Sequence, residues 1–124
     1  MARILIIEDE PLNVDLLVQL LEDDYQLVVA ADGPEGLARA TSKKPDLILL
    51  DISLPRMDGY EVARRIKADP ALHQTVVVGL SAHAMDGDRQ KALDAGCDAY
   101  LTKPLDEDLL FDVLARYLGG KTVA

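Results

Sequence analysis

The chain has 124 residues, of which 49% are hydrophobic, and a formal net charge of −9. This length predicts one globular domain, and the excess of acids argues against nucleic acid and anionic membrane surfaces as direct partners, since both attract Lys and Arg. No apolar run approaches the roughly 20 residues of a membrane span, and the N-terminus lacks a signal-peptide cleavage site. The single Cys97 excludes an internal disulfide, so we expect a cytoplasmic protein without membrane insertion and Cys97 as a small buried filler.

Five short apolar runs predict β-strands. Several of them are apolar at every residue, which is typical of parallel strands that are covered on both faces. In chain order the runs are Arg3–Ile7, Gln26–Ala30, Asp46–Leu50, Thr75–Leu80 and Asp98–Leu101.

Helix-start and helix-stop residues lie between these runs. They are Pro11 for the first helix, Pro34 for the second, Asp58 with Glu61 for the third, a segment from about Asp86 to Ala95 closed by Gly96 for the fourth, and Asp106 for the fifth. Five strand–helix units joined by right-handed crossovers predict an α/β fold with a parallel sheet between two helix layers. Because Gly119 and Gly120 would stop the last helix, we expect one domain over residues 1–119 and a flexible tail over 120–124.

Polar side chains follow the predicted strands at one edge of the sheet. In a doubly wound parallel sheet, functional groups gather beyond the carboxyl ends of the strands. The residues that follow these ends are Glu8 and Asp9, Asp51, Ser81 and Lys103. Three carboxylates, a hydroxyl and a lysine are therefore expected to converge.

Packed carboxylates predict a cation among them. They raise one another's pKa and destabilise the fold unless positive charge separates them, and Lys103 offsets only part of their charge. Mg²⁺ suits a site with two or three protein oxygens and retained waters, whereas the sequence has no dense ligand loop for Ca²⁺. The alternative is that these acids are solvated strand ends and helix caps, and for Glu10, which directly precedes Pro11, we prefer that interpretation.

Asp51 is the candidate acceptor of a phosphoryl group. The acidic stretch after the first strand disfavours a resident nucleotide or flavin, whose phosphates would require a glycine-rich loop there. A metal site would instead recruit a phosphoryl group transiently, and an aspartate can accept it as an acyl phosphate. Lys103 and Ser81 would then hold the phosphoryl oxygens.

Four motifs, "IIEDEP", "DLILLDISLPRMDG", "GLSAHA" and "AYLTKPL", resemble the receiver domain of bacterial two-component response regulators, in the same order and over nearly the whole chain. The resemblance implies a flavodoxin-like (βα)5 fold whose five parallel strands have the order 2-1-3-4-5. It implies a stand-alone phosphoacceptor switch of the CheY or DivK type rather than an enzyme, because no output domain follows the fifth predicted helix. The expected partners are a histidine kinase or a histidine phosphotransfer protein, and a downstream protein target.

The resemblance also implies residue roles at the acidic edge. Asp51 would be phosphorylated by a phosphohistidine donor, and Lys103 would bind the phosphoryl group. The carboxylates of Asp9 and Asp51 and the main-chain carbonyl of Ser53 would ligate Mg²⁺. Glu8 would act mostly through water.

Two switch residues follow from the same resemblance. Ser81 would move to hydrogen-bond the new phosphoryl oxygens, and Tyr100 would swing into the space that it leaves. The surface of the fourth helix, fifth strand and fifth helix would then change for a partner. Without the resemblance, Tyr100 is an ordinary half-buried strand aromatic. The Lys103–Pro104 bond resembles the cis peptide of the family.

Two functions of other classes compete with this one. A Mg²⁺-dependent phosphohydrolase would need a second acid two residues beyond the nucleophile, where Ser53 stands, and a cap that encloses the substrate. A flavin-binding electron carrier conflicts with the acidic loop after the first strand. His83 also has two interpretations: a solvated loop histidine, or a neighbour of the route by which water reaches phosphorylated Asp51.

Apolar residues cover two sides of the first predicted helix. The strip expected to cover the sheet is Leu12, Leu16, Leu17 and Leu20, and the second strip is Val14, Val18 and Leu21. The second strip indicates either a wide, deeply packed helix or a docking surface for the four-helix bundle of a histidine kinase or phosphotransfer protein.

Overall fold

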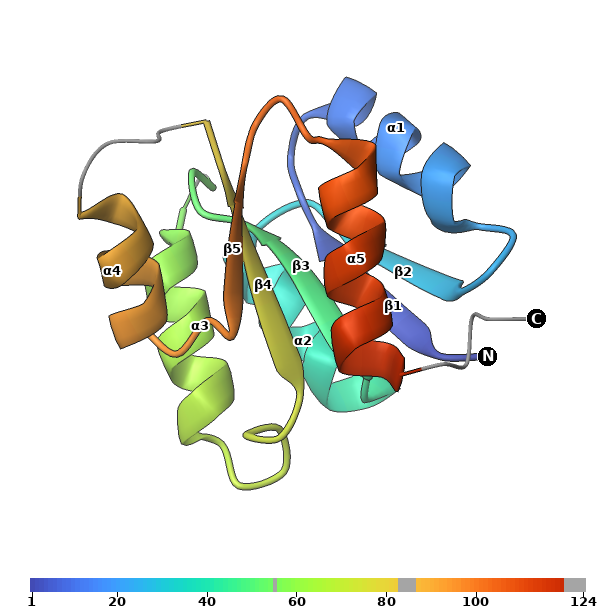
Figure 1. Ribbon diagram of the computed structural model, residues 1–124. Coiled ribbons are helices and arrows are strands. Elements are labelled where there is room, and N and C mark those ends of the chain that lie inside the picture. The colour runs from blue at the N-terminus through green and yellow to red at the C-terminus, as the bar shows by residue number, and fades with distance from the viewer. Residues whose placement is uncertain (55, 83–86, 120–124) are drawn as a thin grey trace.

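The computed structural model describes residues 1–54, 56–82 and 87–119, and it shows a five-stranded parallel sheet between two layers of helices (Figure 1). The sheet has the predicted order β2-β1-β3-β4-β5, and the flavodoxin-like fold is confirmed. The strands are β1 (Arg3–Ile7), β2 (Gln26–Ala30), β3 (Leu47–Asp51), β4 (Val76–Ser81) and β5 (Ala99–Thr102). The helices are α1 (Pro11–Leu21), α2 (Gly33–Lys43), α3 (Gly59–Ala68), α4 (Asp88–Asp94) and α5 (Glu107–Leu118). The predicted tail and His83 lie outside the described residues.

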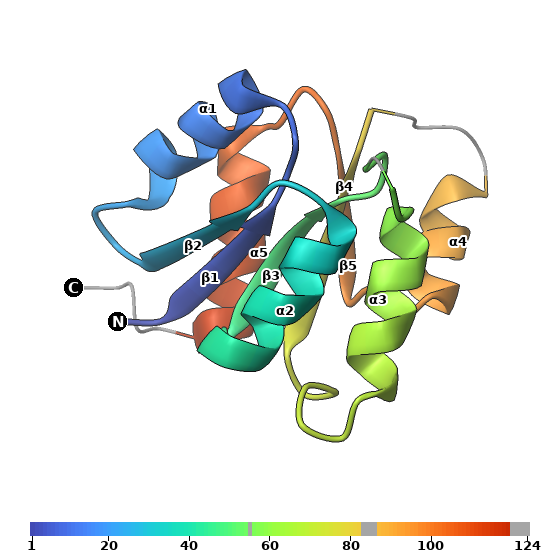
Figure 2. The ribbon, with the colours of Figure 1, turned by 180° about the vertical axis from the view of Figure 1, so that it is seen from behind.

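Two hydrophobic cores explain why the strands are apolar at every residue. Successive side chains of a strand point to opposite faces of the sheet. In β1, Leu5 and Ile7 pack into the core under α2, α3 and α4, whereas Ile4 and Ile6 pack into the core under α1 and α5. Figure 2 shows α2 and α3 on the first of these faces. Cys97 is buried in the same core as α3, and burial raises the pKa of its thiol to about 11, which confirms it as a filler.

Strands β3, β4 and β5 each begin and end one residue later than the sequence predicts. Asp51 pairs with Leu80 and Ser81 with Thr102, so the functional side chains are the last residues of paired strands. Asp46 instead lies before β3, where its carboxylate accepts a hydrogen bond from the backbone N–H of Arg3 at 2.8 Å. Ladder pairing between strands therefore continues one residue further than the apolar runs themselves.

The helix caps follow the sequence prediction closely. The carboxylates of Glu10, Asp58 and Asp106 accept backbone N–H bonds from the first turns of α1, α3 and α5. Helix α2 begins one residue before Pro34, because Asp32 caps it by accepting from the N–H of Glu35 at 2.8 Å.

The predicted start of the fourth helix, near Asp86, lies outside the described residues. Within them, α4 ends at Asp94, and Gly96 follows with the left-handed φ of 109° that the cap prediction requires.

The prediction of which side of α1 faces the sheet is wrong in part. Leu17 and Leu21 are fully buried and Val18 packs against the same core, whereas the side chain of Leu12 is 76% exposed and that of Leu16 is 42% exposed. Leu17 and Leu20 of the predicted strip therefore do cover the sheet, whereas Leu12 and Leu16 do not. Val18 and Leu21 of the second strip also pack on the core, so they cannot form the docking surface that the sequence suggested. Both strips recur at helical spacing, so periodicity alone could not distinguish them.

The helices in the described part of the chain are all shorter or less apolar than a membrane-spanning segment has to be.

Candidate functional site

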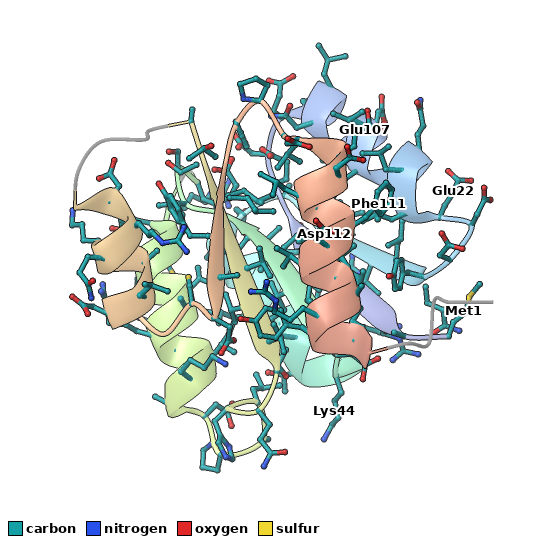
Figure 3. All side chains as sticks on the ribbon, viewed as in Figure 1. Met1, Glu22, Lys44, Glu107, Phe111 and Asp112 are labelled. Atoms are coloured by element: carbon teal, nitrogen blue, oxygen red, sulfur yellow. The ribbon has the colours of Figure 1, made fainter. Side chains whose placement is uncertain are left out.

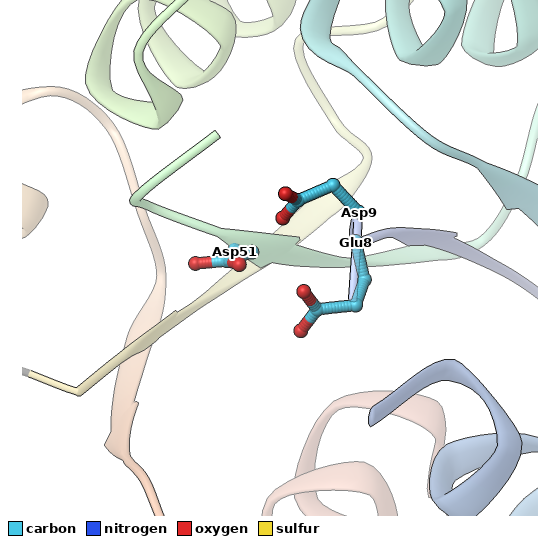
Figure 4. Close-up of side chains that lie close together, drawn as sticks. All are labelled: Glu8, Asp9 and Asp51. Atoms are coloured by element: carbon cyan, nitrogen blue, oxygen red, sulfur yellow. The ribbon is translucent and has the colours of Figure 1, made fainter. Parts of the chain in front are cut away.

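Three carboxylates converge at the carboxyl edge of the sheet. Glu8 and Asp9 directly follow β1, and Asp51 ends the neighbouring strand β3. One oxygen from each lies within 4.8 Å of the others, and Figure 4 shows the three side chains around a common space. Glu8 and Asp51 are buried, with 1% and 5% of their surface exposed, whereas Asp9 is open to solvent. The predicted convergence of the three acids is therefore present in the fold.

Lys103 inserts its ammonium group between two of these acids. Its Nζ lies 2.8 Å from Oε1 of Glu8 and 3.3 Å from Oδ2 of Asp51. The lysine follows β5, and its backbone N–H donates to the carbonyl of Ser81 at 2.7 Å, which fixes the loop against the end of β4. The Lys103–Pro104 peptide is cis, as the resemblance implied.

Burial and charge shift the pKa of buried Glu8 and of half-buried Lys103. Burial raises the pKa of Glu8, and neighbouring Asp51 adds to that rise while Lys103 opposes it. Burial alone would lower the pKa of Lys103, but the carboxylates of Glu8 and Asp51 outweigh it, so the pKa of the lysine lies above its usual value. Lys103 thus stays charged, and it is held in place by negative charge.

The loop after β3 presents Asp51 through a close backbone contact. The N–H of Ser53 donates to Oδ1 of Asp51 at 2.9 Å, and the N–H of Gly59 donates to the carbonyl of Ile52 at 3.0 Å. A Cβ at position 59 would lie 2.5 Å from the backbone Cα of Ile52, so only glycine allows α3 to start so near the acceptor strand. This role is not among the predictions from the sequence, although the glycine directly after the Asp58 cap is a signal for it.

Ser81 and Tyr100 lie at different depths from the edge. Ser81 ends β4, beside the end of β3, and only 2% of its surface is exposed. Tyr100 pairs with Gly79 and is buried in the core under α3 and α4. A Cβ at Gly79 would lie 3.3 Å from Cδ1 of Ile52, so glycine at this position allows close packing beside Tyr100.

The donor set fits Mg²⁺. Carboxylate oxygens are the ligands that this hard cation prefers, and it commonly binds through one or two carboxylates with waters retained. Two of the three acids are buried, and Lys103 neutralises only part of their charge. A divalent cation among Glu8, Asp9 and Asp51 would remove the remaining repulsion.

A family model, the response regulator receiver domain, matches residues 4–115. The chain belongs to the response regulator receiver domain family. Response regulator PleD of Caulobacter vibrioides is 43% identical over 111 residues, which are 89% of this chain and 24% of PleD. The signal transduction histidine-protein kinase BarA of Escherichia coli is 39% identical over 98% of this chain and 13% of BarA. The receiver domain thus spans about a quarter or less of these two relatives.

Single-domain proteins and solved structures are similar over almost their whole length. The polar-differentiation response regulator DivK of Brucella anthropi is 37% identical over 94% of this chain and 95% of DivK. The receiver domain of the sensor histidine kinase PA1611 from Pseudomonas aeruginosa, solved with a magnesium ion coordinated in its active site cleft, superposes with a TM-score of 0.87. It is 34% identical and covers 95% of this chain and 98% of its own.

Replacing Lys103 with Met should destabilise the receiver domain, and the loss should grow with pH. Without its ion pair, the raised pKa of Glu8 would rise further. A carboxyl group with a raised folded-state pKa stabilises the fold below its unfolded pKa of about 4.3, and this contribution is lost as the pH rises above that value.

Urea unfolding in EDTA measures this effect at pH 5 and pH 7.5. We expect the difference between the unmodified chain and Lys103→Met to be larger at pH 7.5. The matched control, Lys43→Met on the exposed end of α2, should show a small difference at both values. An equal loss for Lys103→Met at both pH values would contradict this role of Glu8.

Proposed function

We propose that this receiver domain accepts a phosphoryl group from a phosphohistidine onto Asp51, in a Mg²⁺-dependent reaction in the cytoplasm. The observation that supports the proposal most is the position of Asp51: a buried carboxylate that shares an edge with Glu8 and Asp9 and whose Oδ2 lies 3.3 Å from Lys103. When bound, Mg²⁺ would offset negative charge on the carboxylates and the phosphoryl oxygens. Asp9, Asp51 and the main-chain carbonyl of Ser53 would hold it directly, and Glu8 through water.

The transfer exchanges one bond to phosphorus for another. A carboxylate oxygen of Asp51 attacks phosphorus, the P–N bond to the donor imidazole breaks, and the imidazole nitrogen keeps the electron pair and later takes a proton from solvent. Lys103 is poised to move from its carboxylate partners to a phosphoryl oxygen, since the product carries more negative charge than Asp51 alone. Ser81 would hold a second phosphoryl oxygen.

The response to phosphorylation would be a shift of population between two conformations. Ser81 would turn toward the phosphoryl group, Tyr100 would fill the vacated space, and α4, β5 and α5 would present an altered surface to a protein target. A change from mostly inactive to mostly active requires about 5 kcal/mol of differential stabilisation, which new charge-assisted hydrogen bonds can supply.

The phosphohydrolase alternative gains no support at this site. Such an enzyme would need a general acid two residues beyond Asp51, and that residue is Ser53, whose N–H instead donates to the acceptor carboxylate.

The donor protein would dock on α1 and the adjoining end of α5. The described surface of α1 exposes Leu12 and Leu16. A cavity of about 130 Å³ opens between Leu16 and Lys103, whose ammonium group contacts Asp51. Its lining residues are Glu8, Asn13, Leu16, Leu17, Leu80, Lys103, Pro104 and Leu105. Figure 3 shows Glu107 and Phe111 on α5, and Phe111 is 38% exposed. When the histidine of a donor protein reaches Asp51, the helices of that protein would cover this apolar surface and its acidic rim.

The acceptor role predicts one labile phosphate per chain. After incubation with acetyl phosphate or phosphoramidate and Mg²⁺, mass spectrometry should show a single phosphate that hydroxylamine removes. Asp51→Asn should carry none, since an amide cannot form an acyl phosphate. A phosphate on Asp51→Asn that resists hydroxylamine would refute the proposal.

The docking surface predicts a selective defect. Leu12→Ala combined with Leu16→Ala should slow transfer from a phosphorylated histidine donor protein by about tenfold, as expected for truncation of apolar contacts at an interface. Labelling by acetyl phosphate should stay unchanged, because this donor needs no docking surface.

Leu93→Ala is the matched control, because Leu93 is an exposed leucine on α4. Equal transfer rates for the double variant and the control would disprove docking on α1.

The switch role predicts that Tyr100 separates phosphorylation from its response. In Tyr100→Ala, Asp51 should label at the normal rate, but the amide chemical shifts of α4, β5 and α5 should change much less on phosphorylation. If phosphorylation changes these chemical shifts as much in Tyr100→Ala as in the unmodified chain, Tyr100 has only a packing role.

A further inference from the structure

Arg56 has a backbone conformation that its residue type does not favour. It lies in the loop after β3 with a φ of 69°, in the left-handed region that costs a non-glycine residue free energy. The other described non-glycine residue with positive φ is Lys44, which caps the end of α2, where left-handed backbone is ordinary. No helix end explains Arg56, and strain of this kind is often kept at functional sites.

The side chain of Arg56 joins two loops at the carboxyl edge of the sheet. Its Nη1 lies 3.5 Å from Oδ2 of Asp32, which is in the loop after β2. Because β1 lies between β2 and β3 in the sheet, this contact bridges the two loops that flank the end of β1. Glu8 and Asp9 follow β1 at that same end. The guanidinium therefore lies at the same edge of the sheet as the acidic site, on the β2 side of β1, whereas Lys103 enters from β5.

Arg56 can leave Asp32 for another anionic partner at little cost in stability. The side chain of Arg56 is 75% exposed, and exposed ion pairs contribute little to stability. Asp32 loses no essential partner when the arginine leaves, because its other carboxylate oxygen still caps α2 through the N–H of Glu35. A guanidinium binds carboxylate and phosphate oxygens alike in a bidentate manner, and the second negative charge of a phosphoryl dianion makes it the stronger partner.

We infer that Arg56 is a substrate-binding residue of the acceptor site that leaves Asp32 to hydrogen-bond the phosphoryl oxygens of the incoming donor. This inference rests on the proposed acceptor function. With an acyl phosphate donor, a carboxylate oxygen of Asp51 attacks phosphorus and the bond between phosphorus and the acyl oxygen breaks. The carboxylate product leaves with the electron pair, and Arg56 neither gains nor loses a proton. Its contribution is to offset the repulsion between a dianion and the three carboxylates as the donor approaches.

Two substitutions with opposite expected effects test the inference. Arg56→Gln removes the charge, so the acetyl phosphate concentration that gives half the maximal labelling rate should rise by about two- to fivefold, the range of one exposed charged contact. Asp32→Asn keeps a helix cap and frees Arg56, so the same concentration should fall. Arg56→Lys, which keeps the charge but not the bidentate fork, should lie between Arg56→Gln and the unmodified chain.

Arg64→Gln is the matched control, because Arg64 is an exposed arginine that pairs with Glu61 within α3. It should leave labelling unchanged. A purely structural ion pair would instead make Arg56→Gln and Asp32→Asn change in the same direction, and that result, or no change in Arg56→Gln, would overturn the inference. Absence of phosphate on Asp51 in the unmodified chain would overturn the proposed function, and the role of Arg56 with it.

Discussion

The contact of Lys103 with Glu8 and Asp51 is the interaction on which the carboxyl edge of the sheet depends. The lysine comes from the loop after β5, yet its partners belong to β1 and β3, on the other side of β4. One ammonium group thus ties together segments that are 95 and 52 residues away in sequence. Removing the lysine leaves two buried carboxylates without compensation, which is far more destabilising than the loss of an exposed pair.

Two apolar cores make this edge rigid enough to hold like charges together. Strand β3 is buried along its whole length and β1 at every residue after Arg3, and the acids lie at the ends of these two strands. The backbone contact between Gly59 and Ile52 then holds the loop after Asp51 against the start of α3. This arrangement holds negative charge at a fixed place, where a bound divalent cation or a phosphoryl group would change the net charge of the site. The acids, the lysine and the hydroxyl come from the ends of four different strands.

Much of this could be predicted from the sequence, because the relevant signals are local. Runs that are apolar at every residue identify buried parallel strands. Since the carboxyl ends of parallel strands meet at one edge of the sheet, Asp51, Ser81 and Lys103 are then expected to lie together. Strand ends were off by one residue, because pairing with a neighbouring strand, and not apolarity, decides where a ladder stops. The face of α1 was assigned wrongly in part, because Leu12 and Leu16 repeat at the same helical spacing as Val14, Val18 and Leu21. Gly59 allows a close approach of two backbone segments and Arg56 has a left-handed backbone, and composition and periodicity record neither feature.

The most direct test of the account is the melting temperature of the unmodified chain and of Asp9→Asn with and without Mg²⁺ at millimolar concentration. If the three carboxylates form a cation site, Mg²⁺ raises the melting temperature of the unmodified chain by mass action. Asp9→Asn should melt higher than the unmodified chain in EDTA, because one repelling charge is gone, and it should gain little from Mg²⁺. A melting temperature of the unmodified chain that does not respond to Mg²⁺ would contradict the account.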